Sequence, residues 1–158
     1  MKNTIEAVRI IPFSTELKDY IKILNVEWLQ KYFRIEDRDE IVLSNPQEEI
    51  IDKGGLIFYA TYKDEIVGTV SLLKVSETVY EISKMAVTST VQGIGIGKFL
   101  LEHCFTVAKE INARTLILYS NRSLKSAIHL YRKYCFVEIP LESGVYERAD
   151  IKMEKVLQ

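Results

Sequence analysis

Three glycines at alternating positions mark the change from a β-rich run to an amphipathic helix, in the segment Gln92–Lys98 (QGIGIGK). Glycine permits a positive φ and lets the main chain approach a ligand closely. The first amides of a helix have no partners within the helix and lie at the positive end of its dipole. A strand, a glycine turn and a helix in this order therefore predict an anion site at the helix N-terminus. A tight turn that holds no ligand is the alternative.

The spacing of these glycines excludes the two commonest phosphate-binding motifs. The dinucleotide fingerprint needs a third glycine where this chain has Lys98. The nucleoside-triphosphate loop needs Ser or Thr after its Gly-Lys pair, and here Phe99 follows Lys98. That loop also needs a glycine where Gln92 stands. A different class of anionic ligand is therefore expected.

Hydrophobic periodicity on both sides of the glycine segment predicts seven β-rich runs and four helices. The β-rich runs cover residues 7–13, 56–62, 66–75, 79–87, 115–119, 136–139 and 151–156. The helices begin near Glu16 (capped by Ser14 or Thr15), at Pro46, after the glycine segment, and at Ser123 as a cap. The order β, α, α, β, β, β, α, β, α, β, β indicates an α+β (mixed α/β) fold. A length of 158 residues suits a single domain, 1–158.

Composition removes several classes of function. The 21 basic and 22 acidic residues give a formal net charge of −1, whereas a general nucleic-acid or membrane binder is expected to be basic. No apolar run reaches the roughly 18 residues that span a bilayer, and the first residues show no secretory signal, so we expect no membrane partner and a cytoplasmic location. Cys104 and Cys135, with His103 and His129, match neither a disulfide framework nor a metal site, so no metal is expected.

Two motifs in these elements resemble the GCN5-related N-acetyltransferase (GNAT) family. The sequence QxxGxG (Gln92–Gly97), after a strand that ends in MAV (Met85–Val87), is similar to the acyl-CoA-binding signature of that family. The segment AIHLYRKYCF (Ala127–Phe136) is similar to its pattern Ala-x-x-Leu-Tyr-x-Lys-x-Gly-Phe. The order of elements also resembles that fold over nearly the whole chain. The resemblance implies a central mixed, mostly antiparallel sheet of about six or seven strands flanked by about four helices, in a single N-acetyltransferase domain.

The resemblance also implies a role for each matching position. Backbone amides of the glycine segment would hold the pyrophosphate of acetyl-CoA, and the end of strand 79–87 would run beside the pantetheine arm. A bulge would splay that strand from strand 115–119 and open a slot for the co-substrate. Tyr131 would protonate the leaving thiolate. The implied acetyl-CoA-binding residues are Met85, Ala86, Val87, Gln92, Gly93, Ile94, Gly95, Ile96, Gly97, Lys98, Asn121, Ala127 and Tyr131.

Two positions depart from the family pattern. Cys135 stands where the family has a glycine, so a local difference is expected in the turn before the next strand. Leu124 stands where the family often has an asparagine that contacts the pantetheine arm. Asn121, three residues earlier, is the candidate substitute for that contact.

Acetyl transfer to a primary amine needs a proton acceptor, because an amine with a pKa near 10.4 is mostly protonated at neutral pH. Glu81 is the candidate base, and a glutamate at the matching position is the base in the histone-acetylating branch of the family. Strict alternation along the strand would place Glu81 on one face with Ser83, Met85 and Val87, unless a bulge intervenes. An exposed carboxylate, or one paired with Lys84, is the alternative.

The expected function is therefore direct transfer of an acetyl group from acetyl-CoA to a primary amine of a small molecule or peptide. A non-catalytic acyl-CoA-binding or sensing module on the same fold is the alternative from another class. A protein that modifies a macromolecule is a third reading. Homodimers are common in the family, so a homodimer is a further expectation.

The near-neutral total charge hides two oppositely charged segments. Residues 36–53 hold seven acidic and two basic side chains, whereas residues 98–133 hold seven basic and two acidic ones. The basic segment follows the glycines, where an anionic co-substrate would dock. The acidic segment falls where the resemblance places a wall of the acceptor pocket. We therefore expect a cationic amine as the acceptor, with a solvated helix face as the alternative.

Overall fold

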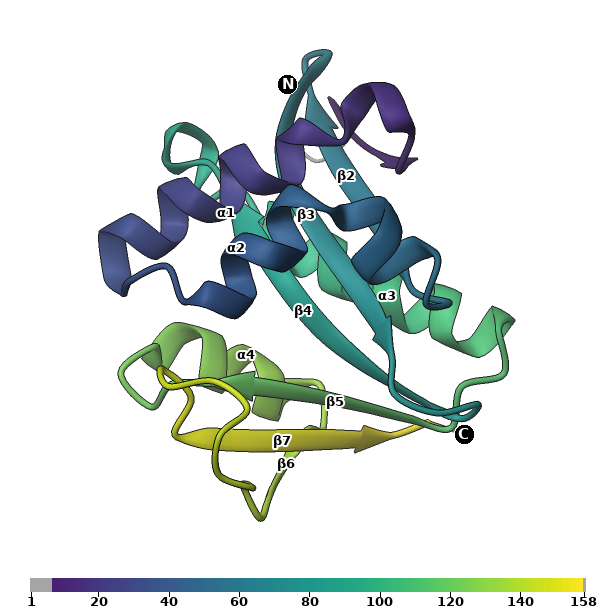
Figure 1. Cartoon of the computed structure of the whole chain (residues 1–158), viewed down its shortest axis with the longest axis vertical. Coiled ribbons are helices and arrows are strands. Elements are labelled where there is room, and N and C mark those ends of the chain that lie inside the picture. Colours follow the sequence, from purple (N-terminus) through teal and green to yellow (C-terminus); the bar gives the residue numbers. More distant parts are fainter. Residues whose placement is uncertain (1–6, 158) are drawn as a thin grey trace.

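The computed structural model describes residues 7–157, and all strands found among them belong to one sheet. The strands are β1 (Val8–Pro12), β2 (Leu56–Tyr62), β3 (Glu65–Lys74), β4 (Val79–Val87), β5 (Thr115–Ser120), β6 (Val137–Ile139) and β7 (Ile151–Val156). Their order across the sheet is β1-β2-β3-β4-β5-β7-β6 (Figure 1). Neighbouring strands are antiparallel except β4 and β5, which are parallel. The mixed, mostly antiparallel sheet is confirmed.

Helices cover both faces of the sheet (Figure 1). They are α1 (Asp19–Tyr32), α2 (Asp37–Ser44), α3 (Ile96–Glu110) and α4 (Lys125–Lys133), with short turns η2 (Thr15–Leu17), η3 (Gln47–Ile51) and η4 (Ser89–Val91). The buried core on the α3 face includes Val70, Leu72, Leu100, Leu101 and Cys104. The buried core under α1, α2 and η3 includes Ile21, Leu43, Ile50, Ile57 and Tyr59. The sheet therefore separates two apolar cores, which together fix its position.

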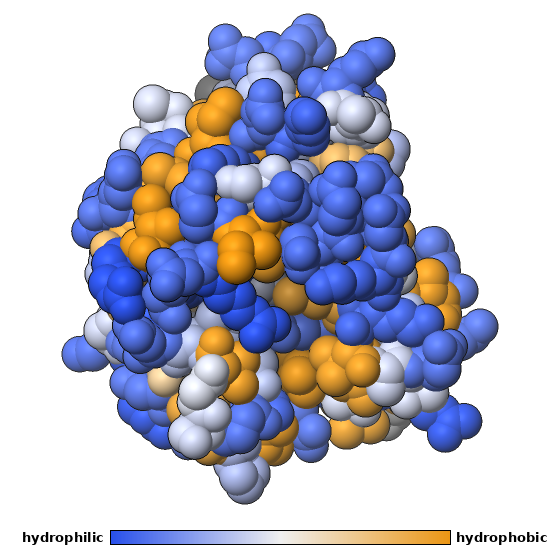
Figure 2. Space-filling view, in the orientation of Figure 1, coloured by the Kyte–Doolittle hydropathy of each residue, from blue (hydrophilic) through white to orange (hydrophobic). Residues whose placement is uncertain are grey.

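The apolar side chains on the face shown in Figure 2 are dispersed. Across residues 7–157, no helix combines the length and the apolar character that a membrane crossing requires. The face in Figure 2 is mostly hydrophilic, and its hydrophobic residues form several separate groups. Exposed large hydrophobic side chains come from different elements, such as Ile23 in α1, Val75 after β3 and Val156 in β7.

Two predicted helix starts differ from the structure. The helix expected near Glu16 is instead the short turn η2, and α1 begins at Asp19 without a side-chain cap. At the start of α4, the N-cap residue is Leu124, because the hydroxyl of Ser123 donates to Asn121 Oδ1 at 2.6 Å instead. Hydroxyl residues near a helix start have alternative local partners, so the predicted caps were wrong although both helices exist.

Strands β4 and β5 diverge after a short paired stretch. Their parallel pairing covers Val79–Glu81 and Thr115–Ile117, and beyond it the two strands separate, as Figure 1 shows. Beyond its pairing with β5, β4 stays paired with β3 and carries a bulge at Lys84. There φ is +55° and the register with β3 shifts. A bulge bends its strand and increases the local twist. The structure therefore contains the slot that the family resemblance implies.

The same bulge changes which side chains of β4 share a face. Strict alternation would put Glu81 on the face of Met85 and Val87, but these two pack against the core on the α3 side. Lys84 instead contacts Asp39 of α2 on the opposite face. The extra residue at the bulge reverses the alternation of the side chains. A bulge does intervene, so Glu81 does not share a face with Met85 and Val87.

Cys135 keeps the left-handed conformation that a glycine favours. Its φ is +70°. The amide of Phe136 donates to the carbonyl of Tyr131, and the amide of Cys135 donates to that of Arg132, both at 3.0 Å. This pair of bonds is the Schellman pattern at a helix C-terminus. The chain thus forms a turn of the kind that glycine favours with a cysteine in its place, and the β-carbon of Cys135 bears strain there.

We expect Cys135→Gly to raise the free energy of unfolding by about 1 kcal/mol, because glycine adopts a positive φ without the steric cost of a β-carbon. Denaturant unfolding of wild type and variant measures the change. Cys135→Ser is the matched control, since it removes the thiol and keeps the β-carbon. A glycine variant no more stable than the serine variant would contradict the strain argument.

Candidate active site

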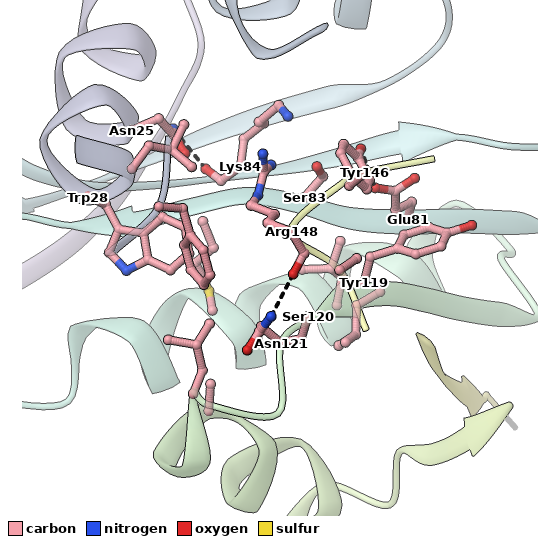
Figure 3. A pocket seen from close by; sticks show the side chains of 18 of the residues that line it. Asn25, Trp28, Glu81, Ser83, Lys84, Tyr119, Ser120, Asn121, Tyr146 and Arg148 are labelled. Atoms are coloured by element: carbon pink, nitrogen blue, oxygen red, sulfur yellow. Dashed lines mark hydrogen bonds between the residues drawn. The ribbon is translucent and has the colours of Figure 1, made fainter. Parts of the chain in front are cut away.

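A cavity of about 190 Å³ lies between the diverging ends of β4 and β5 (Figure 3). Its walls come from α1, from residues 81–85 of β4, from residues 118–121, from α4 and from residues 146–149 before β7. The predicted site residues that line it are Glu81, Met85, Asn121, Ala127 and Tyr131. Those outside its lining are Ala86, Val87 and the glycine segment Gln92–Lys98. The structure thus brings together the candidate base and acid and places the candidate anion site apart.

Glu81 lies in the wall of the cavity and is only 7% exposed. Its Oε2 accepts a hydrogen bond from the phenol of Tyr146 at 3.0 Å. Burial raises the pKa of Glu81, and the Tyr146 hydrogen bond offsets this only in part. A carboxylate with a raised pKa is a more effective proton acceptor near neutral pH. Glu81 is also not the ion-pair partner of Lys84, whose ammonium binds Asp39.

Tyr131 enters the cavity from α4, a different element from that of Glu81. Its side chain is buried, with its ring centroid 5.9 Å from that of Phe136. Burial raises the pKa of Tyr131 to about 12. The phenol therefore keeps its proton at neutral pH and can donate it to a developing anion.

The glycine segment forms the turn into α3. Gly93 and Gly95 have φ values of +90° and +91°, and Gly95 is the N-cap residue, with no side chain capping the helix. The side chain of Gln92 donates to the carbonyl of Val87 at 3.2 Å, which ties this turn to the end of β4. At Gly97, a β-carbon would meet open space. The first amides of α3 are thus available to an anion.

Asn121 lines the cavity, but its side chain is already engaged within the protein. Its Nδ2 donates to the carbonyl of Arg148 at 2.7 Å (Figure 3), and its Oδ1 accepts from the amide of Ser123 at 2.9 Å. Asn121 therefore holds the segment before β7 in place. Leu124 also lines the cavity and adds apolar surface there.

A buried network of charged side chains joins α2, the β4 bulge and the segment before β7. Asp39, which is fully buried, binds Lys84 Nζ at 2.8 Å and the Arg148 guanidinium at 2.6 and 3.0 Å. Glu36 binds the same guanidinium at 2.8 Å, and Asn25 donates to the carbonyl of Lys84 at 3.1 Å. Burial alone would raise the pKa of Asp39, but Arg148 and Lys84 outweigh it and lower the pKa to about 2.

Several lining residues were missed by sequence reasoning. Trp28 and Phe33 recur at helical spacing, a pattern typical of core residues, and they line the cavity while packing against the core. Tyr146 and Arg148 lie in a segment without hydrophobic periodicity, where no sequence signal identified them. Lys84 faces the cavity because of the bulge, which the strand pattern does not reveal.

The acidic segment 36–53 carries less free charge than its composition suggests. Glu36 and Asp39 belong to the buried network, and Glu40 and Glu49 pair with lysines at 2.7 and 2.8 Å. Partnered carboxylates attract a distant cation weakly. The argument from composition for a cationic amine as the acceptor therefore loses most of its support.

Comparison with known proteins relates the chain to one family. The model of the acetyltransferase (GNAT) family matches residues 19–135. YvbK of Bacillus subtilis (strain 168), an uncharacterised N-acetyltransferase, is 31% identical over 101 residues, which cover 62% of this chain. The match spans 65% of the length of that relative.

Solved structures show the same fold. A GNAT-family acetyltransferase from Staphylococcus aureus Mu50 superposes with a TM-score of 0.85 at 22% identity, covering 96% of this chain and all of the other. An acetyltransferase from Bacillus subtilis in complex with CoA gives a TM-score of 0.73 at 22% identity, covering 96% and 99%. With the family match over residues 19–135, the predicted resemblance, fold and enzyme class are confirmed: this chain belongs to the GNAT family of acetyltransferases.

Proposed function

We propose that this chain transfers an acetyl group from acetyl-CoA directly to a primary amine. The observation that carries the proposal is that Glu81 and Tyr131 line one cavity, from two separate elements, between the diverging strands β4 and β5. A covalent enzyme intermediate is not required. Cys104 is buried with a pKa raised to about 12, so its thiol stays protonated, and Cys135 lies outside the cavity lining.

The bonds and protons of this reaction balance with these two residues. The amine nitrogen forms a bond to the thioester carbon while the carbon–sulfur bond breaks. From the ammonium form the nitrogen loses two protons: Glu81 takes the first before attack, passes it to solvent, and takes the second as the amide forms. Tyr131 gives one proton to the sulfur, and exchange with solvent restores both residues, with a net release of one proton. Because deprotonating an amine of pKa 10.4 at neutral pH costs about 4–5 kcal/mol, Glu81 is expected to contribute more than Tyr131.

The start of α3 supports acetyl-CoA as the co-substrate. Its available amides and the glycines before it suit a pyrophosphate, and the Bacillus subtilis neighbour is described in complex with CoA. Residues Gln92–Lys98 would hold the phosphates, and Met85–Val87 would lie beside the pantetheine arm. A cytoplasmic location and a homodimer stay predictions from sequence and resemblance.

We expect acetyl-CoA to raise the melting temperature of the wild type, and to raise that of Gly97→Glu by about half as much or less. At about 100 times Kd a ligand stabilises the fold by about 2.7 kcal/mol. The added carboxylate repels the phosphates, with at least about tenfold weaker binding, yet it suits a helix N-terminus and should not destabilise the free protein. Thermal unfolding with and without acetyl-CoA measures both effects.

Gly97→Gln is the matched control, because it has the size of the glutamate without its charge. It should keep most of the acetyl-CoA shift. An unchanged melting curve of the wild type at saturating acetyl-CoA would contradict the proposed function. A clear shift without release of CoA on any primary amine would favour the non-catalytic acyl-CoA-binding module instead.

A further inference from the structure

Aromatic side chains form a large part of the cavity wall. Tyr119 and Tyr146 lie on the side of Glu81, and Trp28 lies at the other end of the view in Figure 3. The rings of Tyr119 and Tyr146 meet edge to face, with centroids 5.5 Å apart. Phe33 lies beside Trp28, at a centroid distance of 5.6 Å. A ligand that enters this space therefore meets largely rigid aromatic surfaces, and the Tyr146 ring already has Lys84 and Arg148 at 5.1 and 5.0 Å from its centroid.

The two cations that line the cavity are already neutralised. Lys84 is 3% exposed at its side chain and binds Asp39 at 2.8 Å. Arg148 donates from Nη1 to Glu36 and Asp39, and from Nη2 to Asp39. The two cations, Lys84 and Arg148, and the two carboxylates, Glu36 and Asp39, together carry no net charge. They offer little attraction to a carboxylate on an incoming molecule, because each buried cation already has its counter-charge.

Glu81 is the remaining charged residue of the cavity lining, and it has no ion-pair partner in the described part of the chain. It has a hydrogen bond from Tyr146 but no cation within salt-bridge distance among residues 7–157. An acceptor amine placed near Glu81 is stabilised by it, whereas a second anion there is repelled. A further cation on the acceptor finds no second free carboxylate in the lining.

We propose that the acceptor is an arylalkyl monoamine without a carboxylate beside its amine. This inference rests on the proposed function and specifies its acceptor. The aromatic body packs against Tyr119 and Tyr146, and the amine lies toward Glu81. Amino acids are disfavoured because their carboxylate would be buried beside Glu81, and both cations of the cavity lining, Lys84 and Arg148, are already paired. Polyamines gain nothing from their additional charges, because Glu81 is the only carboxylate in the cavity lining among residues 7–157.

Three related amines test the acceptor directly. Phenethylamine, phenylalanine and phenylalanine amide share the phenyl body, and phenylalanine alone carries the carboxylate. With acetyl-CoA as donor and CoA release as readout, we expect kcat/KM for phenethylamine to exceed that for phenylalanine by at least about tenfold. Phenylalanine amide should behave like phenethylamine. Spermidine and butylamine should both be poorer acceptors than phenethylamine.

Two variants test the physical origin of this preference. Tyr119→Leu should lower the ratio of kcat/KM for phenethylamine to that for butylamine, whereas Tyr119→Phe, which keeps the ring, should preserve it. Glu36→Gln partly releases Arg148 and should narrow the gap between phenethylamine and phenylalanine. Ratios within one variant cancel any loss of folded protein.

The outcomes separate this inference from the function on which it rests. Turnover in which phenylalanine or spermidine equals or exceeds phenethylamine overturns the acceptor class and leaves acetyl transfer intact. Absence of turnover with every amine, despite an acetyl-CoA melting shift, overturns catalysis and the acceptor class together.

Discussion

Glu81→Gln should lower kcat by about 10²–10⁴-fold while leaving the melting temperature and the acetyl-CoA shift nearly unchanged. Glutamine has the shape of glutamate and can still accept the hydrogen bond that Tyr146 donates to Oε2 at 3.0 Å. It cannot take a proton from the amine. Steady-state CoA release with saturating amine measures the loss, and thermal unfolding of the same preparations shows that the fold is retained.

The pH profile separates a base from a merely structural carboxylate. Burial raises the pKa of Glu81 above its ordinary value of 4.5, so wild-type activity should rise with pH through that raised pKa as the base loses its proton. The Glu81→Gln variant should lack this rise of activity with pH, the acidic limb of the profile. Because the Tyr146 hydrogen bond lowers the pKa of Glu81, Tyr146→Phe should move the limb to higher pH. A glutamine variant with wild-type kcat and an unchanged profile would exclude Glu81 as the base.

Local patterns were sufficient to predict most of the fold and the separate parts of the candidate site. Alternating apolar residues identified all seven strands, and β7 has the predicted bounds, Ile151–Val156. The glycines before α3 and the stripe that carries Tyr131 are local signals, since a turn needs a positive φ and a helix repeats every 3.6 residues. Both depend on neighbours in sequence, so one chain is enough to see them.

The arrangement around Glu81 could not be predicted, because its determinants are distant in sequence. Asp39 meets Lys84 across 45 positions and Arg148 across 109. The bulge at Lys84 interrupts a run that reads as a regular strand, and it is held by Asn25 on its carbonyl and Asp39 on its ammonium. Helix α2 was missed for a related reason. Its capping box uses Glu36 and Asp39 instead of Ser or Thr, and the same residues bind Arg148.

Asp39 is the residue on which this distant arrangement depends. Among residues 7–157, only Asp39 binds both cations of the network, Lys84 at the bulge of β4 and Arg148 in the segment that carries Tyr146. Removing one partner of a buried ion pair leaves an uncompensated charge, which costs more than the pair itself contributes. Loss of the carboxylate would leave Lys84, almost fully buried, without its ion-pair partner, because Glu81 acts on it only from beyond salt-bridge distance.

We therefore expect Asp39→Asn to lower the free energy of unfolding by about 3–5 kcal/mol, as measured by urea unfolding at neutral pH. Asp37→Asn, an exposed change in the same first turn of α2, is the control and should be nearly neutral. The sign of the pH dependence follows from the lowered pKa. Asp39 titrates near 2 in the folded protein and near 3.8 when unfolded, so its stabilisation is complete above about pH 4 and disappears as the pH falls toward 2. The asparagine variant lacks this contribution, and the stability difference between it and the wild type should shrink over that interval. A constant difference between pH 7 and pH 2 would show that the carboxylate charge is not what holds the bulge and the segment before β7 together.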